Sequence, residues 1–124
     1  GNKILESKYV KGLPHGKHVE WYNDGIKKVE GIYKSGMMNG RWTFWYENGQ
    51  KSEEGTYKDG KEDGLWTRWY EDGQKKYEWT FKNGIKDGKW TNWYDNGQKK
   101  YHGTWKDGKL ISWKEWNEDG SVKE

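Results

Sequence analysis

The sequence repeats itself every 24 residues, and this period constrains the fold more than any other feature. The stretch GRWTFWYENGQKSEEGTYKDGKED at residues 40–63 has related copies before and after it. Its most regular positions form a tryptophan column, Trp21, Trp45, Trp69 and Trp93, and a tyrosine column, Tyr22, Tyr46, Tyr70 and Tyr94. A fixed period of this length is typical of proteins in which one supersecondary unit stacks on copies of itself.

The period divides the chain into one array. Four full units span residues 16–39, 40–63, 64–87 and 88–111, between partial units at residues 2–15 and 112–124. The last partial unit is one residue out of phase, since Trp116 follows Trp93 by 23 residues. We therefore expect a single repeat domain over residues 1–124 with atypical terminal units.

Each unit predicts a β-hairpin. Residues 41–46 and 51–58 are short segments rich in Trp, Tyr and Thr, and Asn48 and Gly49 between them form a dipeptide typical of two-residue type I′ turns. The equivalent pairs are Asp24 and Gly25, Asp72 and Gly73, and Asn96 and Gly97. The second connection, residues 58–64, is expected to be a longer return to the next hairpin. The predicted fold class is all-β: 24-residue hairpin repeats forming an extended, curved antiparallel meander of about ten strands.

A two-residue turn also predicts the strand register. It pairs Trp42 with Gly55, Trp66 with Trp79, and Trp90 with Gly103, and an indole over a strand glycine covers otherwise bare backbone. It also pairs Trp45 with Ser52 and Tyr46 with Lys51.

Side-chain alternation then sorts two faces of the sheet. Face one carries Trp42, Phe44 and their equivalents and is the predicted core. Face two carries Thr43 and the tryptophan column and is predicted to be solvated. The residues expected opposite that column are Lys28, Ser52, Lys76 and Lys100, and the lysine stems are expected to cover it.

Composition fits an aromatic core in a folded chain. Aliphatic residues are scarce, but 11 Trp and 9 Tyr supply apolar area, and the net charge is only +3. Each packed aromatic side chain buries roughly 150–250 Å². The absence of cysteine excludes disulfides and favours a reducing, cytoplasmic compartment. Because the sequence starts at Gly1 without Met, an exported or cell-surface protein whose leader has been removed stays open.

The repeated unit resembles the MORN-repeat variant found in bacterial YwqK-type antitoxin proteins. The residues that carry this resemblance are the pattern G.WT.WY.NGQKK..GTYKDGK.DG, repeated from about Lys8 to Gly120. The resemblance implies hairpin repeats in an extended sheet, a role in protein or membrane association, and, for the YwqK group, neutralisation of a partner toxin. The first unit departs from the pattern, with His18 and Glu20 where Trp42 and Phe44 would stand.

The sequence shows no arrangement typical of catalysis. No serine or cysteine nucleophile recurs beside a base, so we expect no enzymatic activity. His15 and His18 form the single histidine pair near metal-ligand spacing, beside Pro14. Four acidic residues beside turn glycines resemble parts of calcium loops, but turn chemistry explains them without a metal: Asp59, Asp63, Asp87 and Asp107. We expect neither a metal nor a cofactor.

Two columns are the predicted partner-binding surface. The lysine column, Lys27, Lys51, Lys75 and Lys99, recurs on alternate strands, roughly 10 Å apart. It suits an acidic partner, anionic lipid or phosphate, unless Glu47, Glu71 and Asp95 neutralise it locally. The predicted contact residues are Trp21, Trp45, Trp69, Trp93, Lys51, Lys75 and Lys99. Ladders of exposed rings also suit glycans or single-stranded nucleic acid, but packing alone produces such ladders.

The leading functional hypothesis is a non-enzymatic protein-binding repeat, a toxin-neutralising antitoxin or immunity protein. The alternative is a module that binds a membrane surface or a cell-envelope glycan. A third hypothesis is a spacer that presents other domains. Charge and composition do not favour nucleic acid, and no apolar run approaches the roughly 20 residues of a membrane span.

Overall fold

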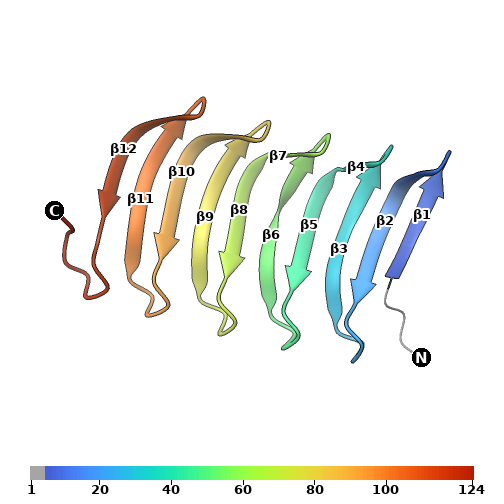
Figure 1. The fold of residues 1–124 in the computed structure, drawn as a ribbon, viewed down its shortest axis with the longest axis horizontal. Coiled ribbons are helices and arrows are strands. Elements are labelled where there is room, and N and C mark those ends of the chain that lie inside the picture. The colour runs from blue at the N-terminus through green and yellow to red at the C-terminus, as the bar shows by residue number, and fades with distance from the viewer. Residues whose placement is uncertain (1–4) are drawn as a thin grey trace.

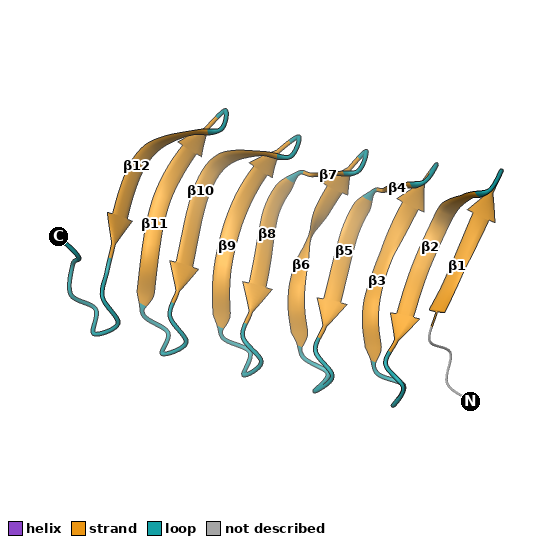
Figure 2. Cartoon of the chain, viewed as in Figure 1, coloured by secondary structure: helices purple, strands orange, loops and turns teal. Residues whose placement is uncertain are grey.

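The computed structural model describes the backbone of residues 5–124 and the side chains of residues 8–124. Residues 2–4, the start of the first partial unit, lie outside this part. The described chain forms one antiparallel sheet without helices (Figures 1 and 2). Its twelve strands are β1 (Leu5–Val10), β2 (Leu13–Trp21), β3 (Lys27–Lys34), β4 (Met37–Met38), β5 (Gly40–Trp45), β6 (Lys51–Lys58), β7 (Lys61–Glu62), β8 (Gly64–Trp69), β9 (Lys75–Lys82), β10 (Ile85–Trp93), β11 (Lys99–Lys106) and β12 (Lys109–Glu115).

Neighbouring strands follow one another in the chain. The path is β1-β2-β3-β5-β6-β8-β9-β10-β11-β12, while the short β4 and β7 pair with β3 and β6. Strands β1 and β12 form the two ends of an open sheet, and β2, β10 and β12 arch near their upper turns (Figure 1). This confirms the predicted curved all-β meander, with ten strands on the main path.

The loop lengths of the two connections in each unit are the reverse of those predicted: the Asn-Gly connection is the longer loop and the other connection is the two-residue turn. At the Asn48 and Gly49 turn, the Gly49 N–H donates to the Tyr46 carbonyl and Tyr46 N–H donates to Gln50, which closes a three-residue loop. Only Gly49 of the pair has positive φ, because the Asn48 side chain instead accepts the Gln50 N–H at 2.9 Å. The two-residue turns lie in the second connection, where Asp59 and Gly60 both have positive φ, 50° and 83°.

A bulge follows from the three-residue loop. Trp42 pairs with Gly55 as predicted, and so do the other two predicted pairs, Trp66 with Trp79 and Trp90 with Gly103. Trp45 pairs with Lys51 and not with Ser52, because the register shifts between Phe44 and Trp45. The three-residue loop moves the pairing next to it by one residue. The extra residue of the bulge moves it back, so that Trp42 still pairs with Gly55.

The bulge also moves the lysines that were predicted to cover the tryptophan column. Their ammonium groups lie 5.6–5.7 Å from tyrosine ring centroids: Lys28 over Tyr22, Lys76 over Tyr70 and Lys100 over Tyr94. That prediction was wrong because it assumed uninterrupted alternation.

The indoles of face one form the core by packing on the preceding unit. Trp42, Trp66 and Trp90 are 1%, 4% and 7% exposed. Trp66 lies directly over Gly55 of the unit before it, and its Nε1 donates to the Thr56 carbonyl at 3.1 Å. The sequence predicted the correct paired residue but the wrong covering indole, because each ring leans across the boundary between units.

Face two is not fully solvated as predicted. Val19 is 3% exposed, and three threonines at the equivalent position are 8–9% exposed: Thr43, Thr67 and Thr91.

Both rows of turns are tied to the next unit. In the lower row of Figure 1, each tyrosine of the tyrosine column donates its hydroxyl proton across the unit boundary, as Tyr46 does to the Trp69 carbonyl at 2.6 Å. In the upper row, Gly60 N–H donates to the Met38 carbonyl at 2.9 Å. These bonds repeat along the array, so each unit is held by its neighbours.

Replacing Gly55 with valine is expected to destabilise the protein by about 3 kcal/mol, because the added Cβ would overlap the Trp66 indole. Denaturant unfolding would measure this change. Thr56→Val is the matched control, since it adds no bulk under that ring and is expected to stay within about 0.5 kcal/mol of the wild type. Equal effects of the two substitutions would contradict the proposed indole packing.

Deleting residues 40–63 is expected to leave a shorter folded sheet. The deletion removes one complete unit, so the Tyr22 hydroxyl meets the Trp69 carbonyl in place of Trp45. Circular dichroism and the unfolding transition would report the result. The control is a twelve-residue deletion of residues 52–63, which makes every following strand run opposite to its native direction and is expected to prevent folding. Equal tolerance of both deletions would contradict unit-wise stacking.

Candidate functional site

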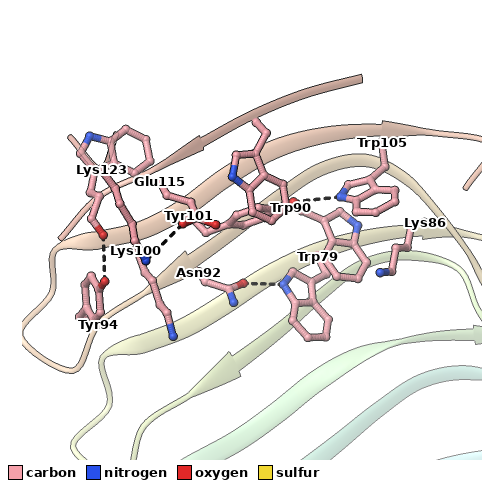
Figure 3. Close-up of a pocket in the computed structure, with 12 residues that line it drawn as sticks. Trp79, Lys86, Trp90, Asn92, Tyr94, Lys100, Tyr101, Trp105, Glu115 and Lys123 are labelled. Carbon is pink, nitrogen blue, oxygen red and sulfur yellow. Dashed lines mark hydrogen bonds and ion pairs between the residues drawn. The ribbon is translucent and has the colours of Figure 1, made fainter. Parts of the chain in front are cut away.

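A groove on face one is the most distinctive recess of the sheet. It has a volume of about 390 Å³ and lies over the last two full units and the C-terminal partial unit (Figure 3). Strands β9 to β12 and the turns after β10 and β12 supply its walls. The lining residues are Trp79, Lys86, Trp90, Asn92, Tyr94, Lys100, Tyr101, Trp105, Trp113, Glu115, Trp116 and Lys123.

Two stacked indoles, Trp79 and Trp90, line the groove, and a third ring, Tyr77, stacks on Trp79. Trp79 lies between Tyr77 and Trp90, with ring centroids 3.6 Å and 4.3 Å away and interplanar angles of 9° and 11°. The Trp79 Nε1 donates to Asn92 Oδ1 at 2.7 Å. Trp79 occupies the position that is glycine in the other units, Gly31, Gly55 and Gly103, so this stack exists only once in the array.

A lysine of the groove lies against this ring stack and against Trp105. The Lys86 ammonium lies 4.7 Å from the Trp90 ring centroid and 4.4 Å from that of Trp105, within cation–π range of both. Lys86 precedes the Gly88 bend and Trp90 follows it, which brings the two side chains together. The carboxylate of Glu115 is paired with Lys123 at 3.6 Å. The groove therefore combines apolar rings with positive charge.

A polar cluster lies beside the groove on the same face. Tyr77 donates its hydroxyl proton to Glu53 at 2.9 Å, and Arg68 lies 3.6 Å from the same carboxylate. Burial and the bond to Glu53 raise the pKa of Tyr77 to about 12. The phenol is therefore neutral at physiological pH and acts here as a hydrogen-bond donor.

Face two holds the predicted tryptophan and lysine columns together. All four tryptophans are partly exposed and all four lysines are exposed. The Lys27 ammonium lies 6.0 Å from the Trp45 ring centroid, so each column borders the other. The structure brings the predicted residues to one face.

The lysine column is neutralised by different carboxylates from those predicted. Lys27, Lys51 and Lys75 pair at 2.9–3.1 Å with the glutamate three residues later, Glu30, Glu54 and Glu78. The predicted partners Glu47, Glu71 and Asp95 are exposed beside the turns. The bulge brings each lysine onto the face of the later glutamate. In unit four the residue three positions after Lys99 is His102.

Glu54 shows how these carboxylates are held. It accepts hydrogen bonds from Lys51 at 2.9 Å and Thr43 at 3.0 Å, and pairs with Arg41 at 2.6 Å. Burial acts to raise the pKa of Glu54, but the bonds from Lys51 and Thr43 and the charge of Arg41 outweigh it and hold the pKa below its ordinary value. Glu54 is therefore ionised and internally satisfied at neutral pH.

The histidines and turn acids have structural contacts. His15 Nδ1 accepts the Ser35 N–H at 3.2 Å, and His18 packs against Tyr33 and Trp42. Asp63 and Asp87 each accept a backbone N–H from the next turn. Within residues 8–124, no three His, Cys, Asp or Glu side chains form a group that could hold a metal ion.

Sequence reasoning missed the groove residues Lys86, Asn92 and Trp105. These positions carry different residues in the other units, and Trp79 stands where the other full units have glycine. Both differences were visible in the sequence. The periodic columns were more visible but describe what every unit shares.

The fold and these surfaces define a class: an open, single-layered sheet of hairpin repeats that serves as a repeat-based binding module. The sequence model of the family described as MORN repeat variant matches residues 14–35, 38–59, 62–83 and 86–107. These matches cover more than half of the chain, which therefore belongs to the MORN repeat variant family. A search among curated proteins found no match. No helix in the described part of the chain is long and apolar enough to cross a membrane.

The Glu54→Gln variant is expected to be about 1 kcal/mol less stable than the wild type at pH 7, because it weakens three interactions with cations and Thr43. Since the folded-state pKa is depressed, this stabilisation is present above the unfolded-state pKa and is lost as the pH falls through the folded-state value. Denaturant unfolding at pH 7 and in the acid range would show the difference shrinking. Glu47→Gln, at an exposed position, is the control; a pH-independent difference for Glu54→Gln would contradict the assignment.

Proposed function

We propose that this chain is a non-enzymatic module that binds a protein partner, with the groove on face one as its principal anchor point. The Lys86 ammonium between the Trp90 and Trp105 rings carries the proposal. An exposed cation flanked by aromatic rings combines ring types that dominate binding hot spots with a charge that orients the partner. The stiff strands around it hold this geometry before binding.

The groove favours an acidic partner segment with an aromatic or aliphatic anchor. Lys86 and Lys100 contact rings through cation–π geometry, at 4.4 to 5.6 Å. The groove's own carboxylate, Glu115, is paired with Lys123. An incoming carboxylate therefore meets net positive charge beside apolar surface.

The predicted columns are proposed as a second contact surface on face two. Their residues are Trp21, Trp45, Trp69, Trp93, Lys51, Lys75 and Lys99. The rings are partly exposed and can contribute apolar area. Lys51 and Lys75 are already paired with glutamates, so Lys99 is the column lysine best suited to an external anion.

A bacterial toxin is the partner that the YwqK-type resemblance supports. The mechanism would be occlusion: a rigid sheet covers the toxin's functional surface, and the groove anchors it. On this proposal the protein acts as an antitoxin or immunity protein and performs no chemistry of its own.

Exposed rings beside the groove favour one alternative, a membrane-surface or cell-envelope glycan module. Trp113 is 51% exposed and lies at the groove edge, and sugars stack on open ring faces. Trp79 cannot serve this way because Tyr77 and Trp90 cover both of its faces. Co-sedimentation with purified cell-wall material, lost in Trp113→Ala, would favour this alternative.

The experiment that tests the proposal is affinity capture from the native host, followed by measurement of the recovered protein's affinity. Lys86→Met is expected to weaken binding at least tenfold, about 1.4 kcal/mol, because it removes the anchoring charge while keeping the stem. Lys82→Met, an exposed lysine outside the groove, is the matched control. Recovery of no protein, or equal affinity of both variants and wild type, would contradict the proposal.

The toxin version has its own readout. The recovered partner expressed alone is expected to arrest growth, and co-expression of this chain is expected to restore it. Lys86→Met is expected to reduce that protection. A harmless partner would contradict the antitoxin role and leave the protein-binding role standing.

A further inference from the structure

In units one and two, face two holds one carboxylate between two cations. Glu30 meets Lys17 at 3.4 Å and Lys27 at 3.0 Å. Glu54 meets Arg41 and Lys51 and also accepts the Thr43 hydroxyl. The two cations come from opposite ends of the paired strands and converge on the central carboxylate.

Unit four has the same cations but lacks that carboxylate. Lys89, Thr91 and Lys99 stand 48 residues after Arg41, Thr43 and Lys51, and His102 stands where the glutamate would be. The backbone register is identical: Thr91 pairs with His102 as Thr43 pairs with Glu54. The charges of Lys89 and Lys99 therefore act on an imidazole in place of a carboxylate.

The groups around this position add positive charge. Lys114 on β12 pairs directly with His102, and its ammonium lies 5.4 Å from the Trp116 ring centroid. On the other side, Glu78 of β9 pairs with Thr91 in the ladder, but its carboxylate is taken by Lys75 at 3.1 Å. Among the described residues, no carboxylate forms an ion pair with Lys89, Lys99 or Lys114.

His102 is held as a neutral group. Its Nδ1 lies 2.9 Å from the Thr91 hydroxyl oxygen. Burial, followed by the charges of Lys99 and Lys89, holds the pKa of His102 below its ordinary value. If Thr91 donates here as Thr43 donates to Glu54, the Nε2 of His102 carries the proton and is a hydrogen-bond donor.

We propose that Lys89, Lys99 and Lys114, with the His102 imidazole that Thr91 orients, form a binding site for a carboxylate of an acidic protein segment. The occupant is a carboxylate because the equivalent cations and threonine already hold one in unit two. The incoming group replaces the glutamate that unit four lacks. This site lies on face two and not in the groove; it rests on the second contact surface proposed above and is tested separately from the groove.

Titration of the purified protein with a hexaglutamate peptide tests this site. Nuclear magnetic resonance of the His102 ring monitors the site itself, and calorimetry measures the affinity and stoichiometry. We expect binding at this site and a rise in the His102 pKa, since an adjacent anion favours the imidazolium. His102→Glu is expected to weaken this binding at least tenfold, because the new carboxylate occupies the site. That variant recreates the unit-two arrangement and is expected to remain folded.

Glu54→His is the matched gain-of-function variant. It removes the carboxylate from unit two and is expected to add one hexaglutamate site to those of the wild type, measured by calorimetry. Hexaglutamine is the uncharged control peptide and is expected not to bind. Lys86→Met, which alters only the groove, is expected to leave the His102 response unchanged.

Several outcomes would overturn the proposal. The first two are equal hexaglutamate affinity of wild type and His102→Glu, and binding of hexaglutamine. The third is loss of the His102 response in Lys86→Met, because that loss would place the peptide in the groove. Binding of inorganic phosphate or phosphatidylglycerol vesicles in preference to hexaglutamate would assign the site to phosphate groups instead. None of these outcomes requires the groove to fail as a partner site.

Discussion

The seating of Trp42, Trp66 and Trp90 on the preceding unit is the interaction on which the rest of the sheet depends. A single-layered sheet has no second layer to exclude water from its core. Here Trp42 covers Gly31 and Trp66 covers Gly55, and each indole N–H donates to a carbonyl of the unit before it. One ring therefore removes apolar area from water, satisfies its own polar atom and couples two units.

That coupling makes the array stiff, which matters for binding. Tyrosine hydroxyls close the unit boundaries along one row of turns and backbone N–H groups close them along the other, as Tyr70 and Gly84 show. A surface held this way loses little conformational freedom when a partner docks. The sheet can therefore present shallow aromatic surfaces to a partner without changing its own conformation.

The sequence predicted the fold, the unit length and the pairing of Trp42 with Gly55 because these follow from period and alternation. It did not predict the bulge at Ser52, since an Asn-Gly pair suits either loop length. The choice was decided by a side-chain contact, Asn48 to the Gln50 N–H, which is invisible in a propensity pattern. That one residue changed the positions of Lys51 and its neighbours, and with them the pairing of the charged surface.

Departures from the repeat locate specificity better than the repeat itself. Positions that are identical in every unit are explained by stacking, capping or internal ion pairs, which any array of this type requires. Trp79 and His102 break two such positions, one on each face, and both lie in the last two full units. Trp79 builds a wall of the groove and His102 leaves lysines without their usual carboxylate. Under the proposed function, the first two units are the support and the C-terminal part of the sheet carries the surfaces that would distinguish one partner from another.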